Sequence, residues 1–287
     1  IVTDHHDIPF VENEGVRTEV LPPADAIVNP KQHDCNYPFP SICGAVVAFK
    51  LIEVLYERFH VDKKESKKLL AYASIATVCD VMDLVDENRV IVKYGLQLLK
   101  NTDNKGLSAL MELHQINTFK LSAYHLGFII GPCLNASGRL ETAKIGLSLL
   151  LEQDDEKARK VAAQLKELND KRKDMTARGV EEAIEIIETT DLINHKVVVV
   201  YLPDCHESLA GIIAGRIRER YHKPAIVLTK AHEGVKGSAR SIEQYNMFEE
   251  LTKCKEYLDK FGGHPMAAGL SLKEENVEPL RLALNHG

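Results

Sequence analysis

Residues 196–201 read Lys-Val-Val-Val-Val-Tyr, an uninterrupted run dominated by β-branched side chains. Such a run predicts a strand buried on both faces, in a sheet that helices cover. An amphipathic helix is expected next, over 208–221. Apolar, β-prone segments predict further strands over 225–229, 235–240 and 267–272. The strand–helix–strand order predicts a small mixed α/β sheet with helices packed on it.

The segment before this sheet, 152–189, has a different character. Acidic and basic residues alternate there around a thin apolar stripe that includes Val161, Leu165 and Leu168, and proline is absent. This pattern predicts one long, partly solvated helix. Because a helix of that length is unusual inside one compact domain, we expect it to connect two domains.

Residues 1–150 are expected to form the first of these domains. Ile1-Val2-Thr3 is typical of the end of a buried strand, and the prolines between residues 7 and 41 indicate loops with one short strand. Helical periodicity is predicted over 44–60, 64–81, 87–100, 106–114 and 120–130. Gly131-Pro132 is expected to end this pattern, which leaves 131–139 as a loop.

Composition excludes several classes of protein. The 287 residues are 45% hydrophobic and 27% charged, as in ordinary globular proteins, and no apolar run reaches the ~18 residues of a membrane span. The net charge of −6 is not that of a strongly basic nucleic-acid binder, although it does not exclude a local basic groove. Six cysteines form no Cys-x-x-Cys pair, so we expect reduced, buried thiols in a cytoplasmic protein without a membrane partner.

Asp4-His5-His6 directly follows the first predicted strand. Side chains converge at strand ends in open α/β sheets, and this triplet offers imidazole nitrogens for a metal or an anion and a carboxylate that fixes a tautomer. A solvated polar turn is the alternative interpretation of the triplet.

Asp80 is flanked by apolar residues, where burying a carboxylate is costly unless it is paired or binds a cation. The alternative is that Asp80 is ion-paired at a helix end, and Asp83 is a second candidate for the cation-binding carboxylate.

Four further segments carry groups that bind phosphate. Residues 131–139 present Asn135 and Arg139 between glycines, and a helix-linking turn is the equally simple interpretation. Residues 237–241 and 262–269 combine small residues with donor side chains, and His206 precedes the helix at 208–221, where it points at a ligand or caps the helix.

Taken together, these segments resemble the DHH phosphoesterase superfamily, and within it the RecJ-type single-strand-specific exonucleases. The ordered motifs that carry the resemblance are residues 3–6, 29–30 with 37–39, 43–44, 76–80, 131–140, 206–208, 237–241 and 262–264.

The resemblance implies a fold and a mechanism. Residues 1–150 would be the C-terminal part of a DHH domain with a parallel sheet, 151–189 the connecting helix, and 190–287 a smaller mixed α/β DHH-associated, substrate-binding domain. Two Mn²⁺ or Mg²⁺ ions would activate a water for in-line hydrolysis of phosphodiester bonds, 5′→3′ along single-stranded DNA. Such an enzyme acts in DNA repair and recombination, and a single-strand-binding protein or a helicase is a further expected partner.

The resemblance also implies residue roles. Asp4, His5, His6 and Asp80 would be catalytic, with His5 and Asp80 as metal ligands. Phosphate would be held by His6, Asn135, Arg139, His206, Ser238, Arg240, Gly263 and His264.

One departure from the family is serious. The family supplies further metal-ligating aspartates from elements before the DHH triplet, and this chain starts at the triplet. We therefore expect an incomplete fragment, also without the C-terminal OB-type domain of bacterial relatives, that is inactive alone. Two alternatives stay open: an oligoribonuclease or cyclic-dinucleotide phosphodiesterase of the same superfamily, and a non-catalytic RecJ-like scaffold.

Overall fold

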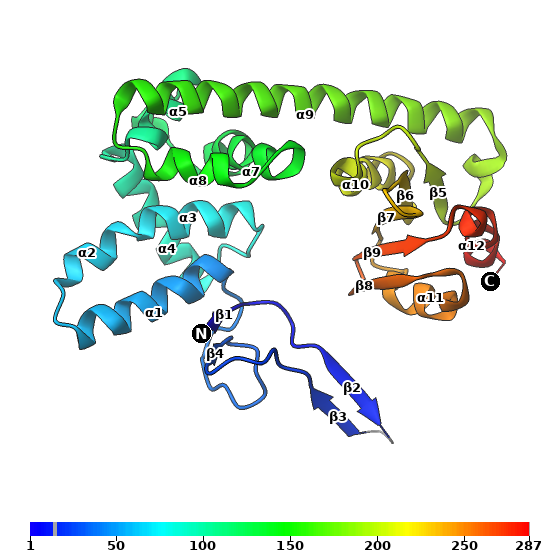
Figure 1. Cartoon of the computed structure of the whole chain (residues 1–287), viewed down its shortest axis with the longest axis horizontal. Helices are drawn as coiled ribbons and strands as arrows, with labels where there is room; N and C mark the ends of the chain where they lie inside the picture. Colours follow the sequence, from blue (N-terminus) through cyan, green and yellow to red (C-terminus); the bar gives the residue numbers. More distant parts are fainter. Residues whose placement is uncertain (14–15, 287) are drawn as a thin grey trace. The chain divides into compact units, whose positions relative to one another are not determined.

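The computed structural model describes residues 1–13 and 16–286. The chain divides into two compact units, residues 1–166 and 167–287, and buried apolar clusters lie within each of them (Figure 1). The predicted α/β class is confirmed, with a parallel strand pair in the first unit and a mixed sheet in the second.

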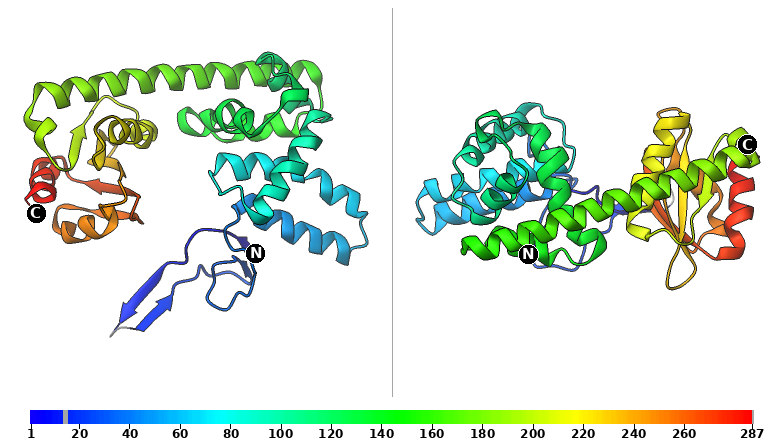
Figure 2. Two further views of the ribbon diagram at one scale, coloured as in Figure 1. Left: turned by 180° about the vertical axis from the view of Figure 1, so that it is seen from behind. Right: turned by 90° about the horizontal axis from the view of Figure 1, so that it is seen from above.

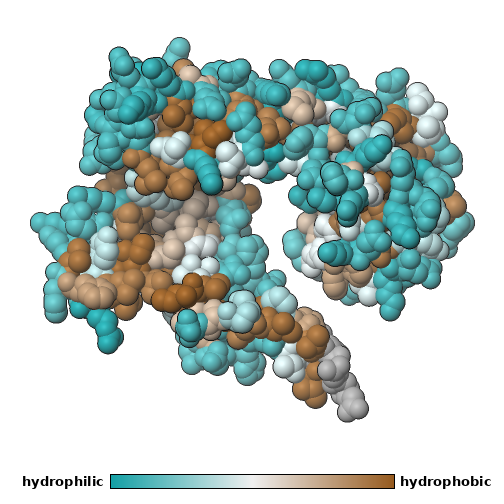
Figure 3. Space-filling view, viewed as in Figure 1, coloured by the Kyte–Doolittle hydropathy of each residue, from teal (hydrophilic) through white to brown (hydrophobic). Residues whose placement is uncertain are grey.

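The first unit begins with two short strand pairs. Strand β1 (Val2–Thr3) pairs in parallel with β4 (Ile27–Val28), while β2 (Phe10–Asn13) and β3 (Val16–Glu19) form an antiparallel hairpin. The hairpin carries exposed apolar side chains and appears largely brown in Figure 3. The sequence indicated one short strand between residues 7 and 41, and the described residues of that segment form three.

Helices make up the rest of the first unit. They include α1 (Gly44–Arg58), α2 (Lys63–Lys68), α3 (Leu70–Cys79), α4 (Asp86–Lys100), α5 (Lys105–Leu113) and α8 (Lys144–Leu151), with a short 3₁₀ turn η1 (Thr118–Lys120). The single helix predicted over 64–81 is divided at Leu69 into α2 and α3. Asp62 begins α2 by accepting a hydrogen bond from the Lys64 N–H at 2.9 Å, a regular N-cap.

The prediction that Gly131-Pro132 ends the helical pattern is wrong. Helix α6 (Ala123–His125), the π-helical turn η2 (Leu126–Ile130) and α7 (Gly131–Leu140) follow one another without a break. In η2 the Gly131 N–H donates to the Leu126 carbonyl, five residues back. This wider turn directly precedes Pro132, where a regular α-helix would suffer the clash of the proline ring with the preceding turn. Residues 131–139 are therefore helical and not a loop.

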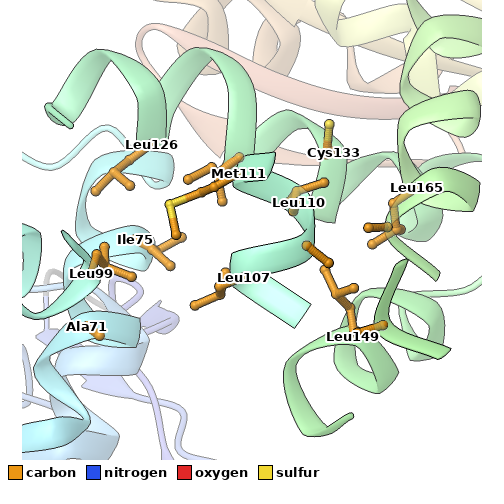
Figure 4. Packing of buried hydrophobic residues seen from close by; sticks show 14 of the residues in the cluster. Ala71, Ile75, Leu99, Leu107, Leu110, Met111, Leu126, Cys133, Leu149 and Leu165 are labelled. Atoms are coloured by element: carbon orange, nitrogen blue, oxygen red, sulfur yellow. The ribbon is translucent and has the colours of Figure 1, made fainter. Parts of the chain in front are cut away.

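The core of the first unit is formed by large aliphatic side chains from α3, α4, α5, η2 and α8. Leu99, Leu107, Leu110, Leu126 and Leu149 are at most 1% exposed, and Figure 4 shows their side chains together with Met111 between the helices. This packing fixes α3 and α7, which carry two of the predicted motifs, against the same core.

Helix α9 spans Asp155–Thr189 and is the long helix that the charge pattern predicts over 152–189. Figures 1 and 2 show it as one uninterrupted helix. Its Ala158, Ala162 and Leu165 join the core of the first unit, whereas Ala183 and Ile187 join a core of the second. No helix among the described residues has the combination of length and apolar character needed to cross a membrane.

The second unit is built on a five-stranded sheet of order β5-β6-β7-β9-β8. Its strands are β5 (Val198–Tyr201), β6 (Ala225–Lys230), β7 (Val235–Arg240), β8 (Lys260–His264) and β9 (Ala267–Leu272). Only β5 and β6 are parallel; the remaining pairs are antiparallel. The strands predicted from sequence are confirmed, and β8 is an additional one.

Helices cover the two faces of this sheet unequally. On one face, α11 (Met247–Lys253) and α12 (Val277–Asn285) cover an apolar layer that includes Val235, Ala239 and Leu270. On the other face, α10 (Ala210–Tyr221) packs on β6 and β7. The short turns η3 (Asp191–Asn194), η4 (Glu207–Leu209), η5 (Lys255–Tyr257) and η6 (Glu274–Asn276) complete the unit.

We predict that Leu110→Ala lowers the free energy of unfolding by about 2–5 kcal/mol, because its fully buried side chain leaves a cavity in the core. Leu113→Ala is the matched control on the same helix, since Leu113 is 39% exposed, and we expect a loss of less than ~1 kcal/mol. Denaturant unfolding of the whole chain measures both. Equal losses would contradict the packing described for α5.

Candidate functional site

The Asp4-His5-His6 triplet lies at the end of β1. The Asp4 N–H donates to the Val28 carbonyl of β4 at 3.0 Å, which places the triplet beside the parallel strand pair. The His5 Nε2 atom lies 3.3 Å from the Asp80 Oδ2 atom. Asp80 is the residue that ends α3, and its N–H donates to the Ala76 carbonyl. The structure therefore brings together two residues that the sequence separates by 75 positions.

Asp4 turns toward His6 rather than toward Asp80. Its Oδ1 atom is 2.7 Å from His6 Nδ1, and it also accepts hydrogen bonds from the N–H groups of His5 and His6. The His6 hydrogen bond is the main cause that lowers the pKa of the Asp4 carboxyl below its usual value. Asp4 is thus an anionic group that orients the exposed imidazole of His6.

Asn29, which is 3% exposed, supports the triplet through its side-chain hydrogen bonds. Its amide Nδ2 donates to the His6 carbonyl at 2.9 Å, while its Oδ1 accepts from the Lys31 N–H at 2.9 Å. The Asn29-Pro30 motif is therefore a support for the triplet, a role that the sequence pattern alone did not assign.

The donor set for a metal ion is partial. His5 and Asp80 present an imidazole nitrogen and a carboxylate oxygen, both of which Mn²⁺ and Mg²⁺ accept. Among the described residues, no cluster of three or more His, Cys, Asp or Glu side chains is arranged to bind a metal ion. The pair fits two positions of a metal site and does not complete one.

Helix α7 presents Asn135 and Arg139 from one exposed stripe, because residues four apart lie on the same face of a helix. Ser137, between them, is buried and donates to the Leu134 carbonyl. The start of α7 packs tightly on Cys79, next to Asp80: a Cβ on Gly131 would come 2.2 Å from the Cys79 Sγ atom. Burial raises the pKa of the Cys79 thiol to about 11, which keeps it protonated and suits a packing role.

In the second unit His206 caps the turn η4, as one of its two predicted roles requires. Its Nδ1 atom lies 2.7 Å from the Ser208 hydroxyl and accepts from the Ser208 N–H. His206 is exposed and Ser208 is half-buried. The opposite ring nitrogen of His206, Nε2, takes no part in this hydrogen bond.

Strand register aligns the remaining predicted residues on one face of the sheet. Arg240 pairs with Ala267, and Ala267 pairs with His264, so these three form one cross-strand row. Partners in a row share a face, and residues two apart along a strand share it as well. Ser238 with Gly269 and Gly262 therefore forms a second row on the same face.

This face is open above β9 and β8. A Cβ built on Gly262 or on Gly269 would meet no atom of the described chain within 4 Å. His264, Gly262 and Gly269 are exposed, and the row neighbours Ser238 and Arg240 are partly exposed. We name these two rows the open face. Gly262 and Gly269, which we call the glycine floor, allow the backbone of a ligand to approach the sheet closely.

Arg240 and Gly263 are held by local geometry. The Arg240 guanidinium lies on the first turn of α10, where a Cβ on Gly211 would come 2.7 Å from Nη2. Gly263 belongs to the alternate row with Ala268. Its φ of +151° and a Cβ position 2.3 Å from the Ala267 carbonyl oxygen require glycine, so Gly263 shapes the strand and offers only its backbone to a ligand.

Residues 194–286 match the family model of the DHHA1 domain. The chain is 40% identical over 287 residues to the single-stranded-DNA-specific exonuclease RecJ of Bacillus subtilis, covering 99% of this chain and 34% of the relative. It is 35% identical to RecJ of Escherichia coli, covering 97% of this chain and 50% of the relative. The chain thus spans about a third to a half of these curated relatives.

Solved structures agree with these relatives. RecJ of Thermus thermophilus in complex with Mg²⁺ has a TM-score of 0.79 and 27% identity, covering 90% of this chain and 40% of that one. A structure of exonuclease RecJ bound to manganese has a TM-score of 0.77 and 27% identity, covering 93% and 65%. This chain is therefore similar in sequence and fold to a part of the RecJ exonucleases, and its residues 194–286 match a DHHA1 domain.

Proposed function

We propose that this chain is part of a single-strand-specific 5′→3′ DNA exonuclease of the RecJ type, acting in DNA repair and recombination. The observation that carries the proposal is the contact between His5 and Asp80, which joins the DHH triplet to the distant Asp80 motif at 3.3 Å. In the second unit, the open face supplies the donors that a substrate phosphate needs. We also propose the division into residues 1–150 and 190–287 with 151–189 as the connecting helix.

The proposed roles in the first unit follow from the contacts. His5 and Asp80 are two ligands of a divalent metal site for Mn²⁺ or Mg²⁺, and a bound ion there would neutralise the scissile phosphate and activate water. Asp4 holds the His6 imidazole by its hydrogen bond, so that the ring can donate to a phosphate oxygen. Asn135 and Arg139 offer an amide and a guanidinium from α7, and guanidinium binds phosphate through two hydrogen bonds.

The proposed roles in the second unit follow from the rows of the open face. Ser238, Arg240 and His264 donate to phosphate oxygens of the DNA strand above the glycine floor. Contacts to phosphate alone bind any sequence, which suits an exonuclease that shortens strands regardless of sequence. His206 belongs to the same proposal through its exposed imidazole. A single-strand-binding protein or a helicase as partner, and a cytoplasmic location, stay predictions.

One observation favours the alternative that the protein is a non-catalytic RecJ-like scaffold. His5 and Asp80 have no further His, Cys, Asp or Glu group beside them among the described residues that would complete a metal site. For the same reason we expect the 287-residue chain alone to release no nucleotides. A protein that carries this chain as a working nuclease must bring additional carboxylates to the pair.

The experiment is a degradation time course with the whole natural protein that carries this chain. With Mn²⁺, we expect progressive shortening of a long 5′-phosphorylated single strand and no attack on a blunt duplex. His264→Ala should slow turnover at least ~10²-fold, the size expected for loss of a transition-state phosphate contact. Cleavage confined to strands of a few nucleotides would favour the oligoribonuclease alternative, and absence of cleavage would favour the scaffold.

Substitutions at two neighbouring glycines distinguish an effect on stability from an effect on DNA binding. We predict that Gly263→Ala destabilises the chain by about 1–3 kcal/mol, because its φ of +151° and the close Ala267 carbonyl exclude a Cβ. Gly262→Ala should leave thermal stability unchanged or slightly raised, since its Cβ points into open space.

The same Gly262→Ala variant should weaken binding of a 5′-phosphorylated single strand, because the new methyl group stands on the floor of the open face. Melting curves and fluorescence anisotropy measure the two effects separately. Unchanged affinity in Gly262→Ala would remove the glycine floor from the proposed binding face.

A further inference from the structure

The open face continues beyond Ser238. We infer that a third row, Lys236–Ser271–Lys260, binds a phosphate further along the same nucleic-acid strand. This inference rests on the proposed function, because it extends the proposed DNA contact by two residues along β7 and β8. No predicted motif contains Lys236 or Lys260.

Strand register places the third row. Lys236 pairs with Ser271 across β7 and β9, and Ser271 pairs with Lys260 across β9 and β8. Lys236 lies two residues from Ser238 on β7, and Lys260 two residues from Gly262 on β8, so the row shares the open face. Rows two residues apart are separated by about 6.7 Å along a strand, which puts the first and third rows about 13 Å apart.

The chemistry of the third row suits a phosphate backbone. Two exposed ammonium groups flank the Ser271 hydroxyl. Lysine binds phosphate as a compact point charge with three donors. Lys236 Nζ lies 3.0 Å from Glu207 Oε2, and both side chains are about half exposed. An exposed pair of this kind is held weakly, so a phosphate can compete with Glu207 for the ammonium.

A hollow of about 660 Å³ lies at the same end of the sheet. Lys236 and Lys260 line it together with Lys273 and His232, and so do Glu233 and Asp259. The two carboxylates offset much of the positive charge. This balance suits a passing strand that is held loosely, and it disfavours a tight site for a free anion.

The spacing of the rows also favours a strand over a free phosphate. A stacked strand has one phosphate per about 3.4 Å, so about four nucleotides separate the first and third rows, and fewer if the strand is extended. The floor between them is open at Gly262 and Gly269, where a Cβ would meet no described atom. Only a ligand longer than two nucleotides reaches both ends of this path.

The test compares two ligands that differ only in length. Affinities of the 287-residue chain are measured in EDTA, without hydrolysis, for a 5′-phosphorylated thymidine dinucleotide and for the corresponding 12-mer. We expect the double variant Lys236→Gln/Lys260→Gln to weaken 12-mer binding about tenfold and to leave dinucleotide binding unchanged. Its slope of log K against log salt should fall by about 0.7, the value for one lost phosphate contact to a single strand.

Two controls keep the result specific. Lys255→Gln removes an exposed lysine in η5, next to α11 on the opposite side of the sheet, and should change neither affinity. His264→Ala should weaken both ligands, because it lies in the first row. Melting curves establish that each variant is folded.

The outcomes are distinct. A 12-mer affinity and salt slope that are unchanged in the double lysine variant, with weakened binding in His264→Ala, would overturn the third row and leave the proposed function intact. Equal losses for the dinucleotide and the 12-mer would also overturn it, because the lysines would then act through their general field. Absence of binding by the wild-type chain to either ligand would overturn the third row together with the open face as a DNA contact, whereas the exonuclease proposal itself is decided by the degradation time course of the whole protein.

Discussion

The antiparallel register of β7, β9 and β8 is the constraint on which the proposed binding surface depends. Alternation along these strands sends Val235, Ala239 and Leu270 into the core under α11 and α12 and sends Ser238 and Arg240 to the opposite face. A slip of one residue would exchange the two sets, which burial of the apolar set strongly disfavours. Core packing on one side of the sheet therefore fixes the position of the phosphate donors on the other.

In the first unit the corresponding constraint is α3. Its last turn carries Cys79 against Gly131 at the start of α7, and its final residue, Asp80, meets His5. Parallel pairing of β1 with β4, continued by the Asp4–Val28 hydrogen bond, fixes the position of the triplet beside these strands. One helix thus connects the triplet, the Asp80 motif and the α7 motif. Glycine at position 131 allows α7 to approach Cys79 this closely.

Much of the fold was predictable from patterns that have one physical interpretation. The Val-rich run at 196–201, the alternating segments of β7 and β9 and the charged helix α9 were each predicted with ends that differ by a few residues at most. Two of the failures involve glycine. Gly131-Pro132 suggested a break, yet a π-helical turn accommodates the proline. Strand β8 was missed because two of its five residues are glycine, which is rare in strands.

The candidate site was predictable as a set of residues and not as a geometry. The motifs named Asp4, His5 and Asp80, but the sequence does not reveal that Asp4 turns to His6 while His5 meets Asp80. Likewise, Arg240 and His264 were named separately, and only strand pairing places them in one row across Ala267. Lys236 and Lys260 belong to no motif, since isolated lysines on a surface are common and only their register distinguishes them.

Identifying the face of the sheet that contacts the DNA strand distinguishes the open face from the face covered by α11 and α12. A 5′-phosphorylated oligonucleotide with photoreactive bases is bound to the chain and irradiated, and the crosslinked peptides are identified by mass spectrometry. Binding on the open face predicts crosslinks in residues 236–240, 260–264 and 267–271. Crosslinks concentrated in α11 and α12, on the opposite face of the sheet, would contradict it.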